Sequence, residues 1–480
     1  MTGILRNIVF AIAVLVHLTG CANHQKSKGV TDAVKLLANG QLTQATAMAN
    51  DLLKTQQLTG GEKNTLDSVL DLSDRMRRDF KLSEHDVLQK LSKYNPLIDS
   101  TELKRLAKEG KMDLLTLDGQ RTYFSSCVNN LFRLDTAYAR LRRNLEGASV
   151  DSFTIFKLKH TASVLAKSNH SGKPVNPVKM KLSYTIRVNA DAVPAGETLL
   201  CWMPFPRENH KRQQAVHLIR TEPRINQISP ATDLQRTLYL EKIAVANQPT
   251  IFHAEMEITS FAQSYQLSPE KIAPYQKESP LYKEFTAERP PQIIFNSKIK
   301  LLAKNILQGE TNPLLQVKKI YTWINDSVTW ASALEYSIMP DIPGFVMEKR
   351  HGDCGMQTLL FMTLARSVGI PVKWQSGWML HPGEVNLHDW CEVYYEGIGW
   401  VPLDQSFGLQ ENKNDAIRYF YMTGIDSYRM IVNDDFSRPL TPAKKFYRSE
   451  PYDFQRGEIE WKGGNLYFDK WSWHMEVTYE

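Results

Sequence analysis

The hydrophobic pattern of this chain changes its period at Pro174 and Pro177, and that change limits the folds available to it. Before the prolines, apolar residues recur at steps of three and four, for example at Leu42, Ala45, Ala49 and Leu52. After them, apolar and polar residues alternate one by one over residues 178–188. A helix repeats every 3.6 residues and a strand every two. The sequence therefore predicts a helical domain over residues 30–170, followed by half-buried strands.

The strands after the prolines form a module of their own. A second alternating run covers residues 252–258, and shorter β-like runs separated by turn-forming residues lie between the two. Several short strands of this kind are typical of a sandwich of two sheets. We predict a β-sandwich-like middle domain over residues 175–268.

A proline-rich linker separates this module from the rest of the chain, with Pro274, Pro280, Pro290 and Pro291. Beyond it, helical periodicity comes first and strand-like runs follow. Helices followed by strands favour an α+β domain, which we place at residues 290–430, with a C-terminal β extension at residues 431–480. The expected fold class is thus α+β and multidomain.

Composition excludes several classes of protein. Apolar residues make up 42% of the chain, enough to build more than one hydrophobic core, so the chain is not intrinsically disordered. The 58 Lys and Arg residues exceed the 52 Asp and Glu residues by only six over 480 residues. An excess this small does not favour nucleic acid as a partner.

The first residues have the pattern of an export signal. Arg6 precedes an apolar run over residues 8–16, which is shorter than a bilayer span and ends in Leu-Thr-Gly-Cys at residues 18–21. This ending resembles the lipobox of bacterial lipoproteins. The resemblance implies a signal peptide at residues 1–20, lipid attachment at Cys21, a tether at residues 21–29 and a membrane-anchored protein of the bacterial cell envelope. The alternative is an ordinary secretory signal.

The remaining cysteines are Cys127, Cys201, Cys354 and Cys391. Four cysteines in a chain of this length do not make a disulfide framework. None of them has the spacing of zinc ligands, and the sequence contains no nucleotide loop or flavin signature. We therefore expect neither a metal nor a cofactor, and each cysteine has to be judged by its surroundings.

Cys354 follows a Gly-Asp turn and opens a helical run. The first turn of a helix offers unpaired N–H groups and the positive end of the helix dipole, and both stabilise an anion. A thiolate is favoured at such a position, with pKa values of about 3.5–7.5 instead of about 8.5, and the thiolate is the nucleophilic form. The alternative is that Cys354 is a small buried apolar residue.

A histidine and an aspartate complete a chemical set with Cys354. His388 opens a strand-like run, and Asp404 ends another one 16 residues later. A hairpin through Gly397 and Gly399 would place the two runs side by side. Asp404 could then accept a hydrogen bond from one imidazole nitrogen while the other nitrogen faces Cys354.

Three motifs together resemble the transglutaminase-like superfamily. They are Gly-Asp-Cys-Gly at residues 352–355, opening a helix that ends in Val-Gly-Ile-Pro at residues 368–371, then His-Asp-Trp-Cys-Glu-Val-Tyr at 388–394 and Gly-Trp-Val-Pro-Leu-Asp at 399–404. The resemblance implies a papain-like α+β core with a Cys-His-Asp triad.

Matched motif by motif, the resemblance implies that Cys354 is the nucleophile, His388 the general base and Asp404 the residue that orients it. The family's aromatic residue ahead of the cysteine falls on Trp330, whose indole N–H is a possible oxyanion donor; the alternative is a core tryptophan. One departure is Asp389, where the family commonly has Ala. On the opposite strand face it should not compete for the imidazole, but it could raise the pKa of His388 or bind a substrate amine.

The predicted function is acyl transfer at peptide or amide bonds through a thioester on Cys354, with water as the favoured acceptor. Peptide or protein is the expected substrate. Three alternatives stay open: transfer to an amine by a protein crosslinker, a peptide N-glycanase on the same core, and a non-catalytic binding protein that uses the cleft as a groove.

Overall fold

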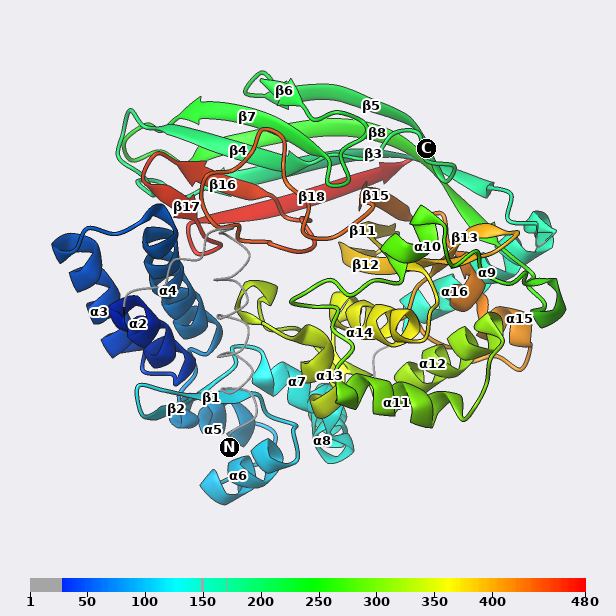
Figure 1. The fold of residues 1–480 in the computed structure, drawn as a ribbon, viewed down its shortest axis with the longest axis horizontal. Coiled ribbons are helices and arrows are strands. Elements are labelled where there is room, and N and C mark those ends of the chain that lie inside the picture. The colour runs from blue at the N-terminus through cyan, green and yellow to red at the C-terminus, as the bar shows by residue number, and fades with distance from the viewer. Residues whose placement is uncertain (1–27, 148–150, 170) are drawn as a thin grey trace. The chain divides into compact units, whose positions relative to one another are not determined.

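The computed structural model describes residues 28–147, 151–169 and 171–480 (Figure 1). The predicted signal peptide and Cys21 lie outside these residues. Helix α2 begins at Lys28, so the last two residues assigned to the predicted tether, 28 and 29, are helical. No helix in the described part of the chain is long and apolar enough to cross a membrane.

The chain folds into two compact units and passes between them several times. Among the described residues, the first unit comprises residues 28–147, Glu288–Ile294 and Ser327–Leu360. The second unit comprises Asp151–Ala287, Phe295–Asp326 and Phe361–Glu480. The predicted α+β domain at residues 290–430 therefore contributes to both units.

Helices dominate the first unit, as predicted, and their ends are set by capping side chains. Thr59 and Ser83 each form a reciprocal capping box with an acidic residue three positions later, which satisfies two N–H groups at the helix start. The helices are α2 (Lys28–Ala38), α3 (Leu42–Thr55), α4 (Gly60–Asp79), α5 (Glu84–Ser92), α6 (Ser100–Lys108), α7 (Cys127–Leu134) and α8 (Thr136–Glu146). Leu42, Ala45, Ala49 and Leu52 are all buried, which confirms the predicted apolar face.

The all-helical prediction for residues 30–170 is wrong in two respects: this range contains a β-hairpin, and its last helix belongs to the second unit. Strands β1 (Leu114–Leu117) and β2 (Gln120–Tyr123) pair around a turn at Asp118 and Gly119. Four-residue strands are too short for alternation to stand out from helical periodicity. Helix α9 (Ser152–Ser168) belongs to the second unit, where it contacts strands of the middle domain.

The first unit is completed by residues that directly precede and include Cys354. Strand β9 (Thr329–Trp330) pairs in parallel with β10 (His351–Gly352). Between them lie the 3₁₀ turn η2 (Tyr336–Ile338) and helix α13 (Ile342–Lys349). Helix α14 (Cys354–Ser367) then begins in the first unit and ends in the second.

Two five-stranded sheets form the predicted sandwich in the second unit. One has the order β14-β8-β3-β18 with β5 on β8, and the other has the order β17-β16-β4-β7-β6. Inward-facing residues of both sheets, such as Leu182 and Trp202, share one hydrophobic core. The strands are β3 (Val175–Val188), β4 (Thr198–Pro204), β5 (Gln213–Glu222), β6 (Gln227–Ile228), β7 (Thr237–Ile243), β8 (Thr250–Ser264), β14 (Gly424–Ile425), β16 (Glu458–Trp461), β17 (Gly464–Leu466) and β18 (Trp471–Tyr479).

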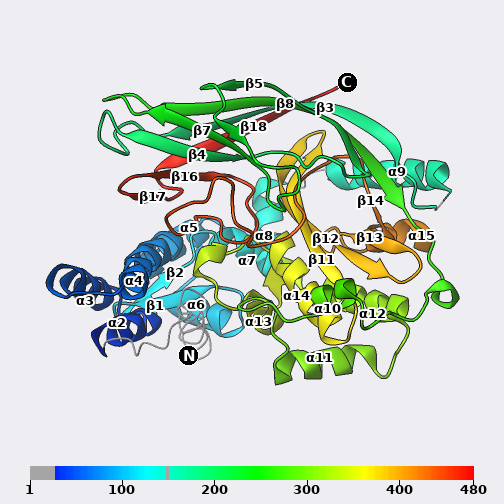
Figure 2. The ribbon, with the colours of Figure 1, turned by 45° about the horizontal axis from the view of Figure 1, so that its top comes forward.

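The C-terminal residues are part of this sandwich and not a separate extension. Strand β18 pairs with β3 along nine residues, from Trp471 opposite Val188 to Tyr479 opposite Met180. Strand β16 pairs with β4 in the other sheet. Figures 1 and 2 show β18, in red, beside the green strands of the middle domain. The boundary expected at residue 431 is therefore not a structural boundary.

A four-stranded antiparallel sheet carries the second half of the predicted motifs. Its order is β13-β12-β11-β15. The strands are β11 (Val372–His381), β12 (Glu384–Tyr395), β13 (Gly399–Leu403) and β15 (Arg429–Asn433). The helices of this region are α10 (Pro280–Phe285), α11 (Ser297–Leu307), α12 (Pro313–Ser327), α15 (Asp415–Arg418) and α16 (Phe420–Thr423). Helices followed by a sheet agree with the predicted α+β class.

Candidate active site

Cys354 is the first residue of helix α14, as the sequence predicts, and its side chain is half-buried. Asp353 caps the helix: its backbone carbonyl accepts from the Gln357 N–H, and its Oδ1 accepts from the Met356 N–H at 3.1 Å. The Tyr336 hydroxyl also donates to Asp353 Oδ1. The cysteine therefore sits where the first-turn N–H groups and the helix dipole favour a thiolate.

Burial raises the pKa of Asp353 to about 6, although the Tyr336 and Met356 hydrogen bonds work against this rise. At neutral pH the carboxyl is then still mostly ionised, as helix capping requires. The Gly-Asp turn that precedes Cys354 thus has a physical role, since it begins the helix at the cysteine.

His388 and Asp404 are brought together by the predicted hairpin. Strands β12 and β13 are antiparallel with Cys391 opposite Leu403, and Asp404 follows directly. His388 Nε2 lies 2.7 Å from Asp404 Oδ2, and both side chains are buried. A carboxylate can only accept, so Nε2 carries the proton and donates. The imidazole is then left with its basic lone pair on Nδ1.

The Asp404 carboxylate is held ionised by a dense set of donors. Arg429 Nη1 donates to Oδ2 at 2.6 Å, and the backbone N–H groups of Ser406 and Phe407 donate to Oδ1, each at 3.1 Å. Burial alone would raise the pKa of Asp404, but its interactions with His388 and Arg429 outweigh burial and hold the pKa well below its usual range. Asp404 is therefore a permanent acceptor for the histidine.

His388 itself is kept neutral. Burial lowers its pKa below the ordinary value, and this effect exceeds the attraction of Asp404. The Phe407 ring packs 4.8 Å from the imidazole, centroid to centroid, and contributes to that burial. A neutral, oriented imidazole is the form that a general base requires at neutral pH.

The face prediction for strand β12 is confirmed. Trp390 stacks with His388 at a centroid distance of 6.0 Å, so the two share a face. Asp389 points the other way, is buried, and accepts a hydrogen bond from Gln455 Nε2 at 2.8 Å. The net shift of the His388 pKa is downward and is dominated by burial, so the suggestion that Asp389 raises this pKa stays a prediction.

Trp330 is not a core tryptophan. Its side chain is 36% exposed, and the Arg133 guanidinium lies 4.3 Å from its ring centroid. The parallel pairing of β9 with β10 places Trp330 opposite Gly352, two residues before Cys354. Its role as an oxyanion donor stays a prediction.

Sequence reasoning missed the group that supports Asp404. Arg429, on β15, is fully buried and also donates to Asp426 Oδ2 through Nη2 at 2.7 Å. Asp426 Oδ1 in turn lies 3.0 Å from His381 Nε2. One cation thus joins two buried carboxylates, each of which faces a histidine.

Replacing this cation should be costly. Arg429→Gln leaves two buried carboxylates without their counter-charge, and breaking a buried ion pair from one side costs about 3–5 kcal/mol. We expect the free energy of unfolding in urea to fall by about that amount. Arg220→Gln is the control, because Arg220 pairs with Glu255 at an exposed position. Equal effects of the two substitutions would contradict the assignment.

Cys354 belongs to the first unit, whereas His388 and Asp404 belong to the second. His388 and Asp404 form a hydrogen-bonded pair, and Cys354 opens helix α14, whereas their catalytic roles stay predictions. The proton transfer between Cys354 and His388 stays a prediction.

Among the described residues no group of three His, Cys, Asp or Glu side chains is arranged to hold a metal ion.

Comparison with known proteins places these elements in a class. Residues 300–405 match the model of the transglutaminase-like superfamily. Uncharacterized protein YebA of Bacillus subtilis (strain 168) is 24% identical over 132 residues, which cover 23% of this chain and 18% of that protein. The match thus spans less than a fifth of the relative's length.

Two solved structures are also similar. One is a candidate cysteine protease from Cytophaga hutchinsonii, with 16% identity and a TM-score of 0.44, covering 64% of this chain and 91% of that chain. The other is the periplasmic domain of TgpA from Pseudomonas aeruginosa bound to ethylmercury, with 14% identity and a TM-score of 0.24, covering 54% and 97%.

The matched residues include a helix-opening cysteine and a buried His-Asp pair, which supports a papain-like thiol-enzyme class. Residues 300–405 therefore form a transglutaminase-like domain within the chain.

Proposed function

We propose that this protein is a thiol-dependent acyl-transfer enzyme that hydrolyses peptide or amide bonds through a thioester on Cys354. The observation that carries the proposal is the buried hydrogen bond of 2.7 Å between His388 and Asp404. Together with the lowered pKa of His388, it provides a neutral base of fixed tautomer in a superfamily domain that also contains a helix-opening cysteine.

In the proposed reaction, His388 Nδ1 takes the proton of the Cys354 thiol, and the thiolate sulfur attacks the acyl carbon of the amide. The C–N bond then breaks, and the leaving nitrogen takes the proton from the imidazolium. Water attacks the resulting thioester, giving its proton to His388. Departure of the Cys354 sulfur, which takes up that proton, releases the carboxylic acid. Asp404 keeps the tautomer in place throughout.

Water and amines compete for the thioester, and the product reveals which acceptor the enzyme uses. An acyl donor peptide is incubated with the enzyme and a tenfold excess of a primary amine, and free acid and amide are separated by mass spectrometry. We expect free acid to predominate and both products to vanish in Cys354→Ala. Predominant amide that depends on Cys354 would identify an amine-transferring crosslinker instead. Absence of both products with a broad peptide library would contradict the enzymatic proposal.

We further propose that the protein is exported and anchored to a membrane of the cell envelope by lipid on Cys21, since Leu-Thr-Gly-Cys at residues 18–21 resembles a lipobox. Each buried methylene of an acyl chain adds about 0.8 kcal/mol to membrane binding, so two or more chains hold a soluble body firmly. Wild-type protein should sediment with membranes, and Cys21→Ala should shift to the soluble fraction. Identical fractionation of both would disprove lipid anchoring.

A further inference from the structure

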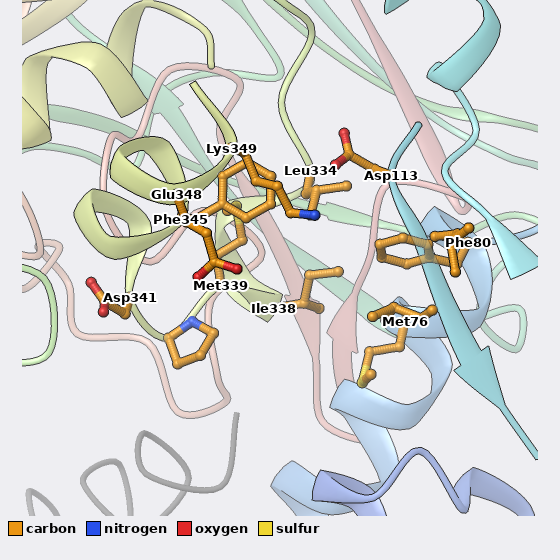
Figure 3. Close-up of a pocket in the computed structure, with 13 residues that line it drawn as sticks. Met76, Phe80, Asp113, Leu334, Ile338, Met339, Asp341, Phe345, Glu348 and Lys349 are labelled. Atoms are coloured by element: carbon orange, nitrogen blue, oxygen red, sulfur yellow. The ribbon is translucent and has the colours of Figure 1, made fainter. Parts of the chain in front are cut away.

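The first unit contains an apolar pocket that the proposed reaction does not use. It has a volume of about 50 Å³, enough for more than one water molecule. Figure 3 shows Met76 and Phe80 on one side, facing Phe345 and Met339 on the other. Leu334 and Ile338 complete the apolar wall, and most of these side chains are buried.

The walls of the pocket are fixed by hydrogen bonds. Asp79, at the end of α4, accepts from the Glu335 N–H at 2.9 Å and ties that helix to the segment before η2. The buried Gln292 side chain donates to the Met339 carbonyl at 3.0 Å and accepts from the Ile342 N–H at 2.8 Å. A pocket with walls tied in this way is formed before a ligand arrives, which reduces the ordering cost of binding.

The charged groups of the pocket have a net negative sign. Asp113, Asp341 and Glu348 line it together with a single basic residue, Lys349. Asp113 is only 5% exposed, and within the described residues its Oδ1 has no hydrogen-bond partner. His351 Nε2 lies 3.4 Å from Asp113 Oδ1. Three carboxylates against one ammonium group favour a ligand that carries positive charge.

The pocket is linked to the cysteine through a short, packed segment. Lys349 ends α13 five residues before Cys354, so the two Cα atoms lie at most about 18 Å apart. The Phe345 ring of the pocket packs edge-on against His351 of β10 at 5.4 Å. An extended peptide covers this distance in about five residues.

We propose that this pocket is a substrate subsite, which binds a large apolar side chain of a peptide next to a basic residue, within about five residues of the acyl group that Cys354 attacks. The inference rests on the proposed function for its link to Cys354. The apolar wall selects the large side chain, and the excess of carboxylates selects the neighbouring cation.

Binding is tested without catalysis, on the full-length Cys354→Ala protein. The probes are acetyl-Lys-Phe-amide, acetyl-Lys-Gly-amide and acetyl-Glu-Phe-amide, and the dissociation constants are measured by NMR titration. Acetyl-Lys-Phe-amide should bind about 10-fold more tightly than either of the others. Equal binding of the three probes would overturn the proposal.

Variants locate the site. Ile338→Trp fills the pocket and should remove the preference for Phe over Gly. Glu348→Lys, at an exposed position, should remove the preference for Lys over Glu, whereas the exposed Asp51→Lys, outside the pocket, should leave both preferences intact. Unchanged preferences in both pocket variants would place binding elsewhere. If the protein binds the probes selectively but cleaves no peptide, the proposed function is contradicted and the subsite is not. If it cleaves peptides without these preferences, only the subsite is contradicted.

Discussion

Cys354→Ala is expected to abolish covalent labelling by an electrophilic thiol probe and to reduce turnover by at least about 10³-fold. The other described cysteines are poor competitors, because Cys127, Cys201 and Cys391 are buried. Burial raises the pKa of Cys127 to about 12 and the pKa of the other two well above the ordinary value. Those three thiols are protonated at neutral pH, and thiols react far more slowly than thiolates.

Iodoacetamide labelling of the folded wild-type protein at neutral pH, followed by peptide mass spectrometry, measures the relative rates. The Cys354 peptide should be modified first, and Cys127→Ala should label and turn over like the wild type. If Cys127, Cys201 or Cys391 reacts faster in the folded protein, Cys354 is not the nucleophile.

Asp404→Asn should reduce turnover by about 10⁴-fold while the fold persists. The amide can present a donor to His388 Nε2, which would favour the tautomer with its proton on Nδ1, where the base needs a lone pair. The substitution also removes one of the two carboxylates on Arg429, so some loss of stability is expected as well.

Asp426→Asn separates these two effects. It removes the other carboxylate from Arg429 but leaves the bond between His388 and Asp404 in place. We expect both variants to unfold at lower urea concentration than the wild type, and only Asp404→Asn to lose most of its kcat. A comparable loss of kcat in Asp426→Asn would mean that the charge cluster, and not the histidine tautomer, determines activity.

The His388–Asp404 pair could be predicted because everything that forms it is local. The two residues lie on adjacent strands of one hairpin, with alternation setting the face and Gly397 and Gly399 setting the turn. The helix start at Cys354 is equally local, since the Asp353 carboxylate bonds to an N–H group three residues ahead of it.

Arg429 could not be placed from the sequence, because its partner strand is chosen by tertiary structure. Strand β15 pairs with β11, about 50 residues earlier, across an irregular register at Ser376 and Gly377. A signal was nevertheless present: an arginine heads the apolar run Met430–Val432, and a charge in a buried strand needs a partner. The sequence indicates that Arg429 needs a negatively charged partner, but it does not indicate which carboxylates are that partner.

The same limit explains the C-terminal strands. Alternation in residues 471–479 favours a strand, but no local pattern states that β3 is its neighbour. The β1–β2 hairpin was missed for the opposite reason, since its strands are too short to show a period.

The pairing of β18 with β3 determines when this protein can finish folding. The two strands are separated by roughly 280 residues of chain, and at about 5–20 residues per second a ribosome needs some tens of seconds to synthesise that interval. Throughout that time the β3 edge that β18 later covers presents unpaired N–H and C=O groups, which invite pairing with other chains. The β3 edge therefore stays open to such pairing until β18, the last strand of the chain, has been synthesised.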